Sequence, residues 1–188
     1  MAERLAQLAD LPEIRTRRLS LVPWQVGDAA VLHAVLQRDH DHLRPWIPFM
    51  RDPPTTLEAT ERFLAACIEQ HRSGVALHYR VVVSETHAFA GEVLLIARED
   101  GCELGYWLAS DQTGHGYATE GARGLVDQAF DALGLDAVFM SCEAENMASN
   151  EVARRLGAHP EERLTVPAVL DDRPVTLVQW VLRGAPPE

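Results

Sequence analysis

The chain of 188 residues is poor in cysteine and has no long apolar segment. Its three cysteines, Cys67, Cys102 and Cys142, are an odd number at wide spacing. Such spacing does not suit a disulfide framework or a zinc site and indicates reduced thiols in a cytoplasm. No apolar run approaches the roughly 20 residues of a membrane-spanning helix, and the N-terminus lacks the basic start and apolar block of a signal peptide. We therefore expect a cytoplasmic protein with no membrane partner.

Positive charge is also in short supply. Asp and Glu number 28 against 17 Lys and Arg, which gives a net charge of −11. Because nucleic-acid binding depends on a positive surface, we expect no nucleic-acid partner. A negative field raises the local concentration of cationic or amine-bearing molecules, although it also serves plain solubility. The eight histidines are scattered without ligand spacing, so we expect no metal site.

The composition that remains, with 47% apolar residues, is typical of one globular domain. After a leader at residues 1–13, the apolar pattern predicts a single domain over residues 14–188. Strands are predicted at residues 14–22, 77–83, 88–97, 102–109, 137–144, 163–166 and 175–182. Helices are predicted from Asp28, from Thr55 or Thr56 to Gly74, from Ala118 to Gly134 and from Asn146 to Gly157. A mixed α/β sheet of about seven strands with helices on both faces is the economical architecture.

A glycine turn lies at the centre of this pattern, where Gly114-His115-Gly116 joins a short apolar strand to the long predicted helix that follows it. The first turn of a helix has backbone N–H groups without internal partners, and these bind phosphate. A Rossmann fingerprint would need a glycine where Thr119 stands, and the string of a P-loop is missing. The glycines alone leave open a plain tight turn between strand and helix.

Several sequence motifs, which occur in a fixed order along the chain, narrow the choice between a phosphate-binding turn and a plain tight turn. They are Leu43-x-Pro45-Trp46-Ile47-Pro48, Glu103-Leu104-Gly105-Tyr106-Trp107-Leu108, Gly114-His115-Gly116-Tyr117-Ala118-Thr119-Glu120 and Asn146-x-x-Ser149-x-x-Val152-x-x-x-Leu156-Gly157-Ala158. Together they resemble the GCN5-related N-acetyltransferases (GNAT), and most closely the RimJ/RimL type, which acetylates the amino termini of ribosomal proteins and, in many relatives, small amines. The resemblance covers the chain from about Arg15 to Leu182. It implies the acyl-CoA N-acyltransferase fold, acetyl-CoA as the acetyl donor and an amine as the acceptor.

The resemblance also implies where the donor binds. Backbone amides from Gly114 to Thr119 would hold the pyrophosphate, and the pantetheine arm would lie in a V between the strands at residues 106–109 and 139–144. The residues expected to bind the cofactor are Trp107, Leu108, Thr113, Gly114, His115, Gly116, Tyr117, Ala118, Thr119, Asn146 and Ser149. Thr113 stands where the family has Gln or Arg, so we expect binding mainly through the backbone.

The implied reaction is direct attack of a neutral amine on the thioester, which needs a proton acceptor. Glu103 and Glu92 are the candidate bases, acting directly or through water. The family's usual acid, a tyrosine seven residues after the asparagine, is replaced here by Ala153, whereas Ser149 matches the serine of the RimL-like branch. Ser149 is therefore the candidate contact of the departing sulfur. Both Ser149 and Asn146 also suit an ordinary helix N-terminus.

Proline-rich residues 45–54 carry the aromatic and aliphatic side chains of Trp46, Ile47 and Phe49, which we assign to a wall of the acceptor pocket; plain core cover is the alternative. A second function class also fits the strings. The departures at Thr113 and Ala153 favour an inactive acyl-CoA-binding sensor or partner protein of the same fold. Because the family is often dimeric, a homodimer is a further expectation.

Overall fold

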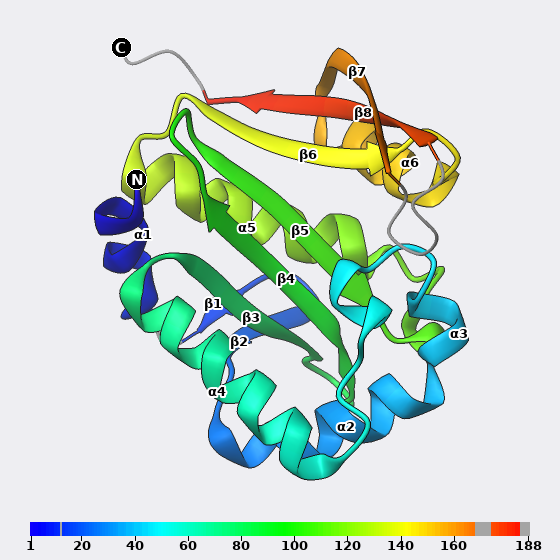
Figure 1. Cartoon of the computed structure of the whole chain (residues 1–188). Coiled ribbons are helices and arrows are strands. Elements are labelled where there is room, and N and C mark those ends of the chain that lie inside the picture. Colours follow the sequence, from blue (N-terminus) through cyan, green and yellow to red (C-terminus); the bar gives the residue numbers. More distant parts are fainter. Residues whose placement is uncertain (12, 168–173, 185–188) are drawn as a thin grey trace.

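The computed structural model describes residues 1–11, 13–167 and 174–184 (Figure 1). Its strands form one sheet in the order β1-β2-β3-β4-β5-β6-β8-β7. Their bounds are β1 Ile14–Arg15, β2 Leu19–Pro23, β3 Ala76–Val83, β4 Phe89–Ala97, β5 Cys102–Leu108, β6 Ala137–Glu143, β7 His159–Pro167 and β8 Pro174–Arg183. The predicted mixed sheet is confirmed, with eight strands in place of about seven.

The additional strand arises because the predicted strand at residues 14–22 is broken by a turn. Thr16 N donates to Leu19 O at 2.9 Å, and Leu19 N donates to the Thr16 hydroxyl oxygen at 3.0 Å. This turn folds β1 back against β2 as an antiparallel pair. A threonine hydroxyl that competes for backbone groups is a common cause of such a turn, and alternation of side chains does not reveal it.

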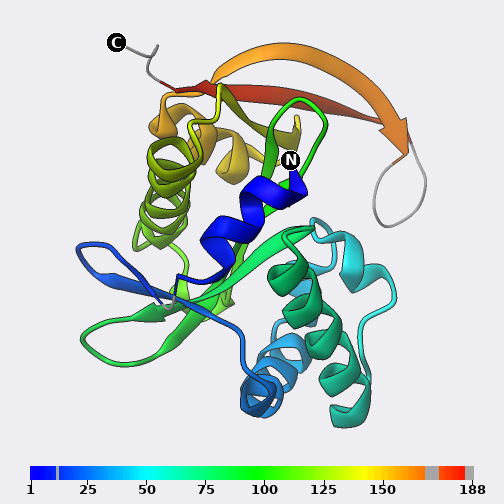
Figure 2. The same ribbon diagram turned by 90° about the vertical axis from the view of Figure 1, so that its left-hand side faces the viewer.

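The helices pack on both faces of the sheet (Figure 2). They are α1 Ala2–Ala9, α2 Ala29–Arg38, α3 His40–Leu43, α4 Leu57–Ser73, α5 Tyr117–Leu133 and α6 Met147–Leu156, with short 3-10 turns η1 Val26–Asp28, η2 Pro48–Arg51 and η3 Ser110–Gln112. One buried cluster joins α5 and α6 to the sheet, and a second joins α2 and α4 to its other face. The expected leader contains α1, whose Leu5 is fully buried in the first cluster.

The ends of the longer helices follow the predicted capping residues. The Thr56 hydroxyl accepts from Ala59 N at 3.1 Å at the start of α4. Three glycines, Gly74, Gly134 and Gly157, end their helices in the left-handed conformation that a side chain disfavours. These local signals were sufficient to place the helix boundaries.

Asp28 is the N-cap residue of α2, as the sequence predicts, but its side chain makes no capping hydrogen bond. Instead, the Asp28 carboxylate accepts from Gln25 N at 2.8 Å and forms an ion pair with Arg80 at 2.9 Å. A charged partner from β3 therefore competes successfully with the helix N–H groups for this carboxylate.

The strands β5 and β6 are the place where the sheet opens. They are parallel neighbours that share only two residue pairs, Cys102 with Val138 and Glu103 with Phe139. Every other adjacent pair of described strands is antiparallel. Beyond Glu103 the two strands diverge (Figure 1). Backbone groups along the gap thus have no strand partner there, and a ligand can hydrogen-bond to them.

Candidate active site

The glycine turn at the end of β5 exposes the start of α5. Gly114 and Gly116 have φ angles of 78° and 79°, which glycine adopts without the steric cost that other residues meet. Gly116 is the N-cap of α5, and Tyr117, Ala118 and Thr119 form its first turn. A methyl group at Gly114 would meet nothing within 4 Å, so the space in front of the turn is open. The turn is therefore suited to an anion.

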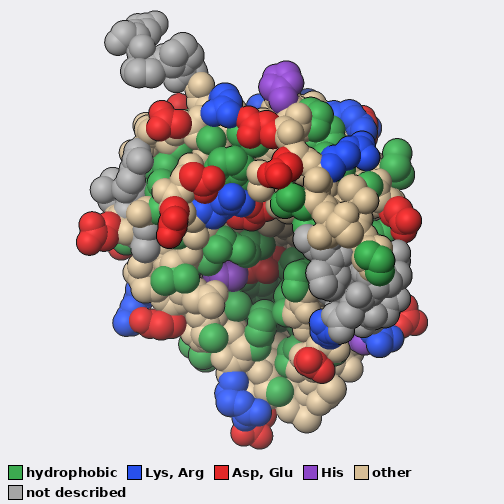
Figure 3. Space-filling view, turned by 45° about the horizontal axis from the view of Figure 1, so that its top comes forward, with side chains coloured by type: hydrophobic (Ala, Val, Ile, Leu, Met, Phe, Trp, Pro, Cys, Tyr) green, Lys and Arg blue, Asp and Glu red, His purple; other side chains and the backbone are tan. Residues whose placement is uncertain are grey.

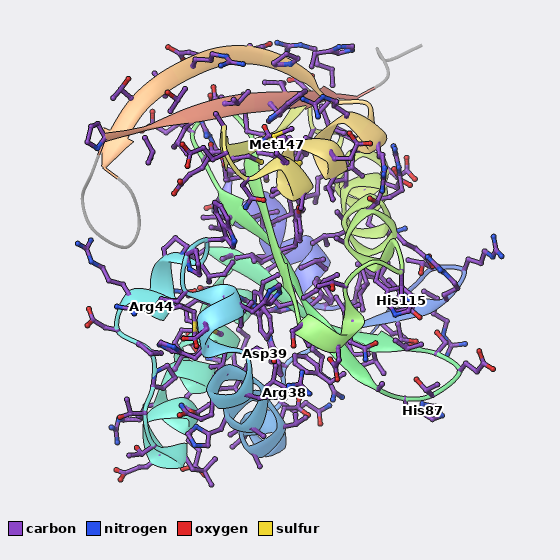
Figure 4. All side chains as sticks on the ribbon, turned by 90° about the vertical axis from the view of Figure 1, so that its right-hand side faces the viewer. Arg38, Asp39, Arg44, His87, His115 and Met147 are labelled. Atoms are coloured by element: carbon purple, nitrogen blue, oxygen red, sulfur yellow. The ribbon has the colours of Figure 1, made fainter. Side chains whose placement is uncertain are left out.

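Two side chains of this turn, those of Thr113 and His115, contact other residues near the turn. The Thr113 hydroxyl donates to Ser110 O at 2.9 Å within the turn itself. The exposed His115 ring lies 5.3 Å from the Tyr117 ring, at the outer side of the turn (Figure 4). The backbone N–H groups at the start of α5 are therefore the main donors that the turn offers to an anion.

An arginine that sequence reasoning missed lies beside the turn. The Arg18 guanidinium stacks over the Tyr117 ring at 4.9 Å, and its Nη2 is 3.6 Å from where a methyl group at Gly116 would stand. Glu120 holds Arg18 through an ion pair of 2.6 Å and also accepts from the Thr16 hydroxyl at 2.7 Å. Although burial raises it, these hydrogen bonds bring the pKa of Glu120 below its usual value. The β1–β2 turn is thereby fastened to the start of α5.

Ser149 lies at the gap between β5 and β6. Its backbone N–H donates to the Asn146 side chain at 3.0 Å, so Asn146 caps α6 as predicted. The Ser149 hydroxyl accepts from the Tyr106 hydroxyl at 3.0 Å and lies 3.2 Å from Cys142 Sγ. Tyr106 belongs to β5 and Cys142 to β6. The hydroxyl of Ser149 thus connects the two diverging strands.

Both neighbours of Ser149 keep their protons at neutral pH. Burial raises the pKa of Tyr106 to about 12, and burial also raises the pKa of the Cys142 thiol. Cys142 is only 5% exposed. It is therefore a packing residue rather than a reactive thiolate.

The first candidate base, Glu103, lies at the closed end of the gap, in the last residue pair before the strands diverge. Its Oε2 accepts from Arg98 Nη1 at 2.6 Å. The same guanidinium lies 4.3 Å from the centre of the Phe139 ring and pairs with Asp100 at 3.0 Å. The Glu103 side chain is partly exposed, with a side-chain exposure of 21%. It therefore keeps access to water.

The second candidate base, Glu92, is buried and surrounded by donors. Trp24 Nε1 donates to Oε1 at 2.8 Å, and Trp107 Nε1 donates to Oε2 at 2.9 Å. His78 Nδ1 is 2.9 Å from Oε1, and its Nε2 is 3.0 Å from the Gln70 side-chain oxygen. Since three hydrogen bonds engage its two oxygens, Glu92 joins α4 and strands β3, β4 and β5 as a polar centre of this face. The indole of Trp107 thus belongs to this polar centre.

The predicted acceptor wall divides into two parts. Ile47 and Phe49 pack on the cluster of α2 and α4, and Phe49 lies 5.0 Å from the Phe63 ring. Trp46 is 39% exposed. Figure 3 shows a deep hollow in the molecule, with hydrophobic side chains on its walls and histidine and acidic side chains inside it. Ile47 and Phe49 therefore act as core cover, whereas the exposed Trp46 stays a candidate contact of an acceptor.

Neither a metal centre nor a membrane span is found in the described part of the chain. None of its His, Cys, Asp and Glu residues form a group of three that could hold a metal ion. None of its helices is both long and apolar enough to cross a bilayer.

Comparison with known proteins points to one family. Residues 18–159 match the family model of the acetyltransferase (GNAT) domain. The chain is similar to the protein of Bacillus licheniformis named uncharacterized N-acetyltransferase p20, with 31% identity over 150 residues that cover 78% of this chain and 82% of that protein.

Solved structures share the fold. RimL, a ribosomal L7/L12 alpha-N-protein acetyltransferase in complex with coenzyme A, has a TM-score of 0.84 and 20% identity, over 92% of this chain and 98% of its own. The Microcin C7 self-immunity acetyltransferase MccE, in complex with acetyl-CoA and AMP, has a TM-score of 0.82 and 17% identity, over 89% and 93%. Mycobacterium smegmatis RimJ, in complex with a CoA disulfide, has a TM-score of 0.79 and 22% identity, over 88% and 81%.

Proposed function

Because the chain belongs to the acetyltransferase (GNAT) domain family, we propose that it transfers the acetyl group of acetyl-CoA to a primary amine in the gap between β5 and β6. The resemblance stated from the sequence strings is thus confirmed at the level of the family. The observation that carries the proposal is the Ser149 hydroxyl, which bridges Tyr106 and Cys142 where the strands have diverged; β5, which carries Tyr106, leads into the open glycine turn.

The donor binds through two features of the chain. The pyrophosphate binds the N–H groups of the first turn of α5, which begins at Tyr117 and carries the positive end of the helix dipole. The amide groups of the pantetheine arm bind the unpaired backbone of β5 and β6. Backbone recognition explains why Thr113 can replace a longer polar side chain at this turn.

Glu103 is the base of this proposal. The amine nitrogen bonds to the carbonyl carbon, the carbon–sulfur bond breaks, and the electron pair leaves on sulfur. The amine proton passes to Glu103 through water, because this carboxylate is partly exposed and engages Arg98 through one oxygen. The donors that occupy both oxygens of Glu92 favour a structural role for that residue.

Ser149 assists the departing thiolate. Its hydroxyl lies at the gap and can donate a hydrogen bond to the sulfur of the thioester. Such a bond is stronger to the developing negative charge of the departing thiolate than to the neutral thioester. The bond therefore favours the transition state over the bound substrate, which is the requirement for catalysis.

The acceptor is a primary amine, either a protein N-terminus or a small molecule. Two observations support a cationic acceptor, the net charge of −11 and the acidic side chains inside the hollow of Figure 3. Trp46 is exposed and available to pack on an acceptor. RimL, which shares the fold, is named for acetylating a protein N-terminus, and MccE, which also shares it, holds the small molecule AMP, so the acceptor panel includes both classes.

The test is amine-dependent release of the CoA thiol from acetyl-CoA, measured with N-terminal peptides and small amines. We expect turnover with at least one acceptor and a kcat about 10-fold to 100-fold lower for Ser149→Ala, with little change in acetyl-CoA affinity. Ser73→Ala removes an exposed serine at the end of α4 and should leave kcat unchanged. Size-exclusion chromatography of the same preparation tests the expected homodimer.

Tight binding of acetyl-CoA without turnover on any acceptor would contradict the enzyme proposal. It would instead favour an acyl-CoA-binding sensor or inactive partner protein. Two departures from the family support that function: the Thr113 hydroxyl bonds to Ser110 within the turn, and Ala153 is a buried methyl group at the position of the usual tyrosine. Failure to bind acetyl-CoA at all would contradict both functions.

A further inference from the structure

The hydrogen bonds of Ser149 leave one direction for its own proton. A hydroxyl oxygen offers two acceptor positions and one hydrogen. The Tyr106 hydroxyl donates into one acceptor position at 3.0 Å, and the Cys142 thiol, at 3.2 Å, can donate into the other. Sulfur is a weak acceptor, so Ser149 gains little by donating to Cys142 instead. With both acceptor positions filled, the Ser149 hydrogen points away from its two neighbours.

We propose that Tyr106 is a positioning residue for acetyl transfer, because its phenolic hydrogen bond orients and polarises the Ser149 hydroxyl so that Ser149 donates to the sulfur of CoA. The inference rests on the proposed acetyl transfer at this gap. Tyr106 comes from β5 and Ser149 from α6, so the contact also fixes the helix against the strand. Donation into a hydroxyl oxygen strengthens the hydrogen bond that the same hydroxyl donates.

Tyr106 acts through Ser149 rather than by giving up its proton. The pKa of Tyr106 is raised to about 12, whereas an ordinary thiol has a pKa of about 8.5. Transfer of the phenolic proton to a thiolate would therefore be unfavourable by roughly a thousandfold or more. The phenol keeps its proton and contributes orientation and polarisation.

The electrostatic surroundings make this donation useful. Burial raises the pKa of the Cys142 thiol, the hydrogen bond with Ser149 lowers it, and the Glu103 carboxylate raises it further. We expect Ser149 and Glu103 to act in the same two directions on a CoA thiol beside Ser149. Negative charge on that sulfur is therefore opposed by Glu103 and favoured by the Ser149 hydroxyl.

The first measurement needs no turnover. The thiol of bound CoA is titrated by its thiolate ultraviolet absorbance, as the difference from CoA-free protein. In Tyr106→Phe we expect the pKa of the bound thiol to rise by about 0.5 to 1 relative to the wild type, which is a 3-fold to 10-fold smaller acid dissociation constant. Ser149→Ala should give a rise at least as large. CoA affinity at pH 6, where the thiol is protonated, should change less than about twofold.

The second measurement is a double-variant cycle on kcat. Tyr106→Phe should lower kcat about 10-fold without changing the KM of acetyl-CoA. In the Ser149→Ala background, Tyr106→Phe should cause no further loss, because its effect passes through the missing hydroxyl. Tyr79→Phe is the matched control, since burial raises the pKa of Tyr79 to about 12 as well and Tyr79 lies on β3. It should leave kcat and the thiol titration unchanged.

An unchanged pKa of the bound thiol in Tyr106→Phe, or losses that add in the double variant, would overturn the role of Tyr106. If wild-type protein binds CoA and the thiol titrates as expected while no amine is acetylated, the proposed function fails, and what stands is the effect of Tyr106, through Ser149, on the bound thiol. If CoA does not bind, both fail.

Discussion

Asp39 holds Ser110 by two atoms at once. Its carboxylate accepts the Ser110 backbone N–H at 2.8 Å and the Ser110 hydroxyl at 2.7 Å. Arg38 binds the same carboxylate through Nε and Nη2, both at 2.8 Å, and reaches Asp111 at 3.0 Å (Figure 4). These contacts hold the end of α2 against η3, the turn between β5 and the glycines of the proposed phosphate site.

The Asp39 contact predicts an acid-dependent part of the stability. The Arg38 hydrogen bonds, opposed by burial and aided by Ser110, place the pKa of Asp39 well below its usual value. The ionised carboxylate therefore stabilises the fold above the unfolded pKa of about 3.9, and this contribution is lost as the pH falls below that value. We expect Asp39→Asn to lower the free energy of unfolding by about 2 to 3 kcal/mol at pH 7.

Urea unfolding between pH 3 and pH 7 measures this effect. The wild type should lose stability toward pH 3 more steeply than Asp39→Asn. Asp41→Asn, an exposed acid two residues further on, is the matched control and should retain the wild-type profile. Parallel acid limbs for the wild type and Asp39→Asn would show that the carboxylate does not carry the pH dependence.

The phosphate turn predicts a larger effect for the glycines than for Thr113. Gly116→Ala places a side chain at a φ of 79°, a conformation that costs a non-glycine residue about 1 to 2 kcal/mol. We expect the backbone to relieve this strain by distorting the start of α5. The Kd of CoA from calorimetry should rise roughly 10-fold. Thr113→Ala should change it less than about threefold, because the hydroxyl bonds to Ser110 within the turn. Gly27→Ala, where a methyl group meets nothing within 4 Å, serves as the control. A stronger effect of Thr113→Ala would overturn backbone recognition.

Local signals in the sequence were sufficient to predict the ends of the longer helices and the succession of strands along the chain. Thr56 and Gly74 show the reason, since a cap depends on a few neighbouring residues and on the φ angle of one glycine. The motif around Ser149 likewise lies within one strand and the helix that follows it.

Contacts between distant segments could not be predicted in the same way. Thr16 and Glu120 are 104 residues apart, and Asp39 and Ser110 are 71 apart. Alternation along a strand assigns a side chain to a face of the sheet, but it does not identify its partner. The two glutamates illustrate this limit, because only the folded chain shows that Trp24, His78 and Trp107 occupy the oxygens of Glu92.

The two glutamates should respond differently to the same substitution. Glu103→Gln removes the proposed base, so kcat/KM should fall at least 10-fold while the melting temperature changes little. Glu92→Gln places an amide donor against indole or imidazole donors, so it should lower the melting temperature by several degrees. Kinetics and thermal unfolding of both variants decide the assignment. A 10-fold loss of kcat/KM in Glu92→Gln with an unchanged kcat/KM in Glu103→Gln would reverse it.

Arg18 should contribute to CoA binding although it lies about 100 residues before the phosphate turn. Its guanidinium lies beside Gly116, so Arg18→Met should raise the Kd of CoA by about 3-fold to 10-fold at low salt, and less at high salt. Arg17→Met removes the charge of an exposed neighbour and should have little effect.

Loss of Arg18 also leaves the Glu120 carboxylate without its cation, and the double variant Arg18→Met/Glu120→Gln separates the two causes. If the guanidinium attracts the phosphates itself, the double variant binds CoA as weakly as Arg18→Met, because removing the carboxylate restores no attraction. If Arg18 serves only to neutralise Glu120, the double variant recovers wild-type affinity. Recovery would assign Arg18 to the fastening of the β1–β2 turn alone and would leave phosphate binding to the backbone of α5.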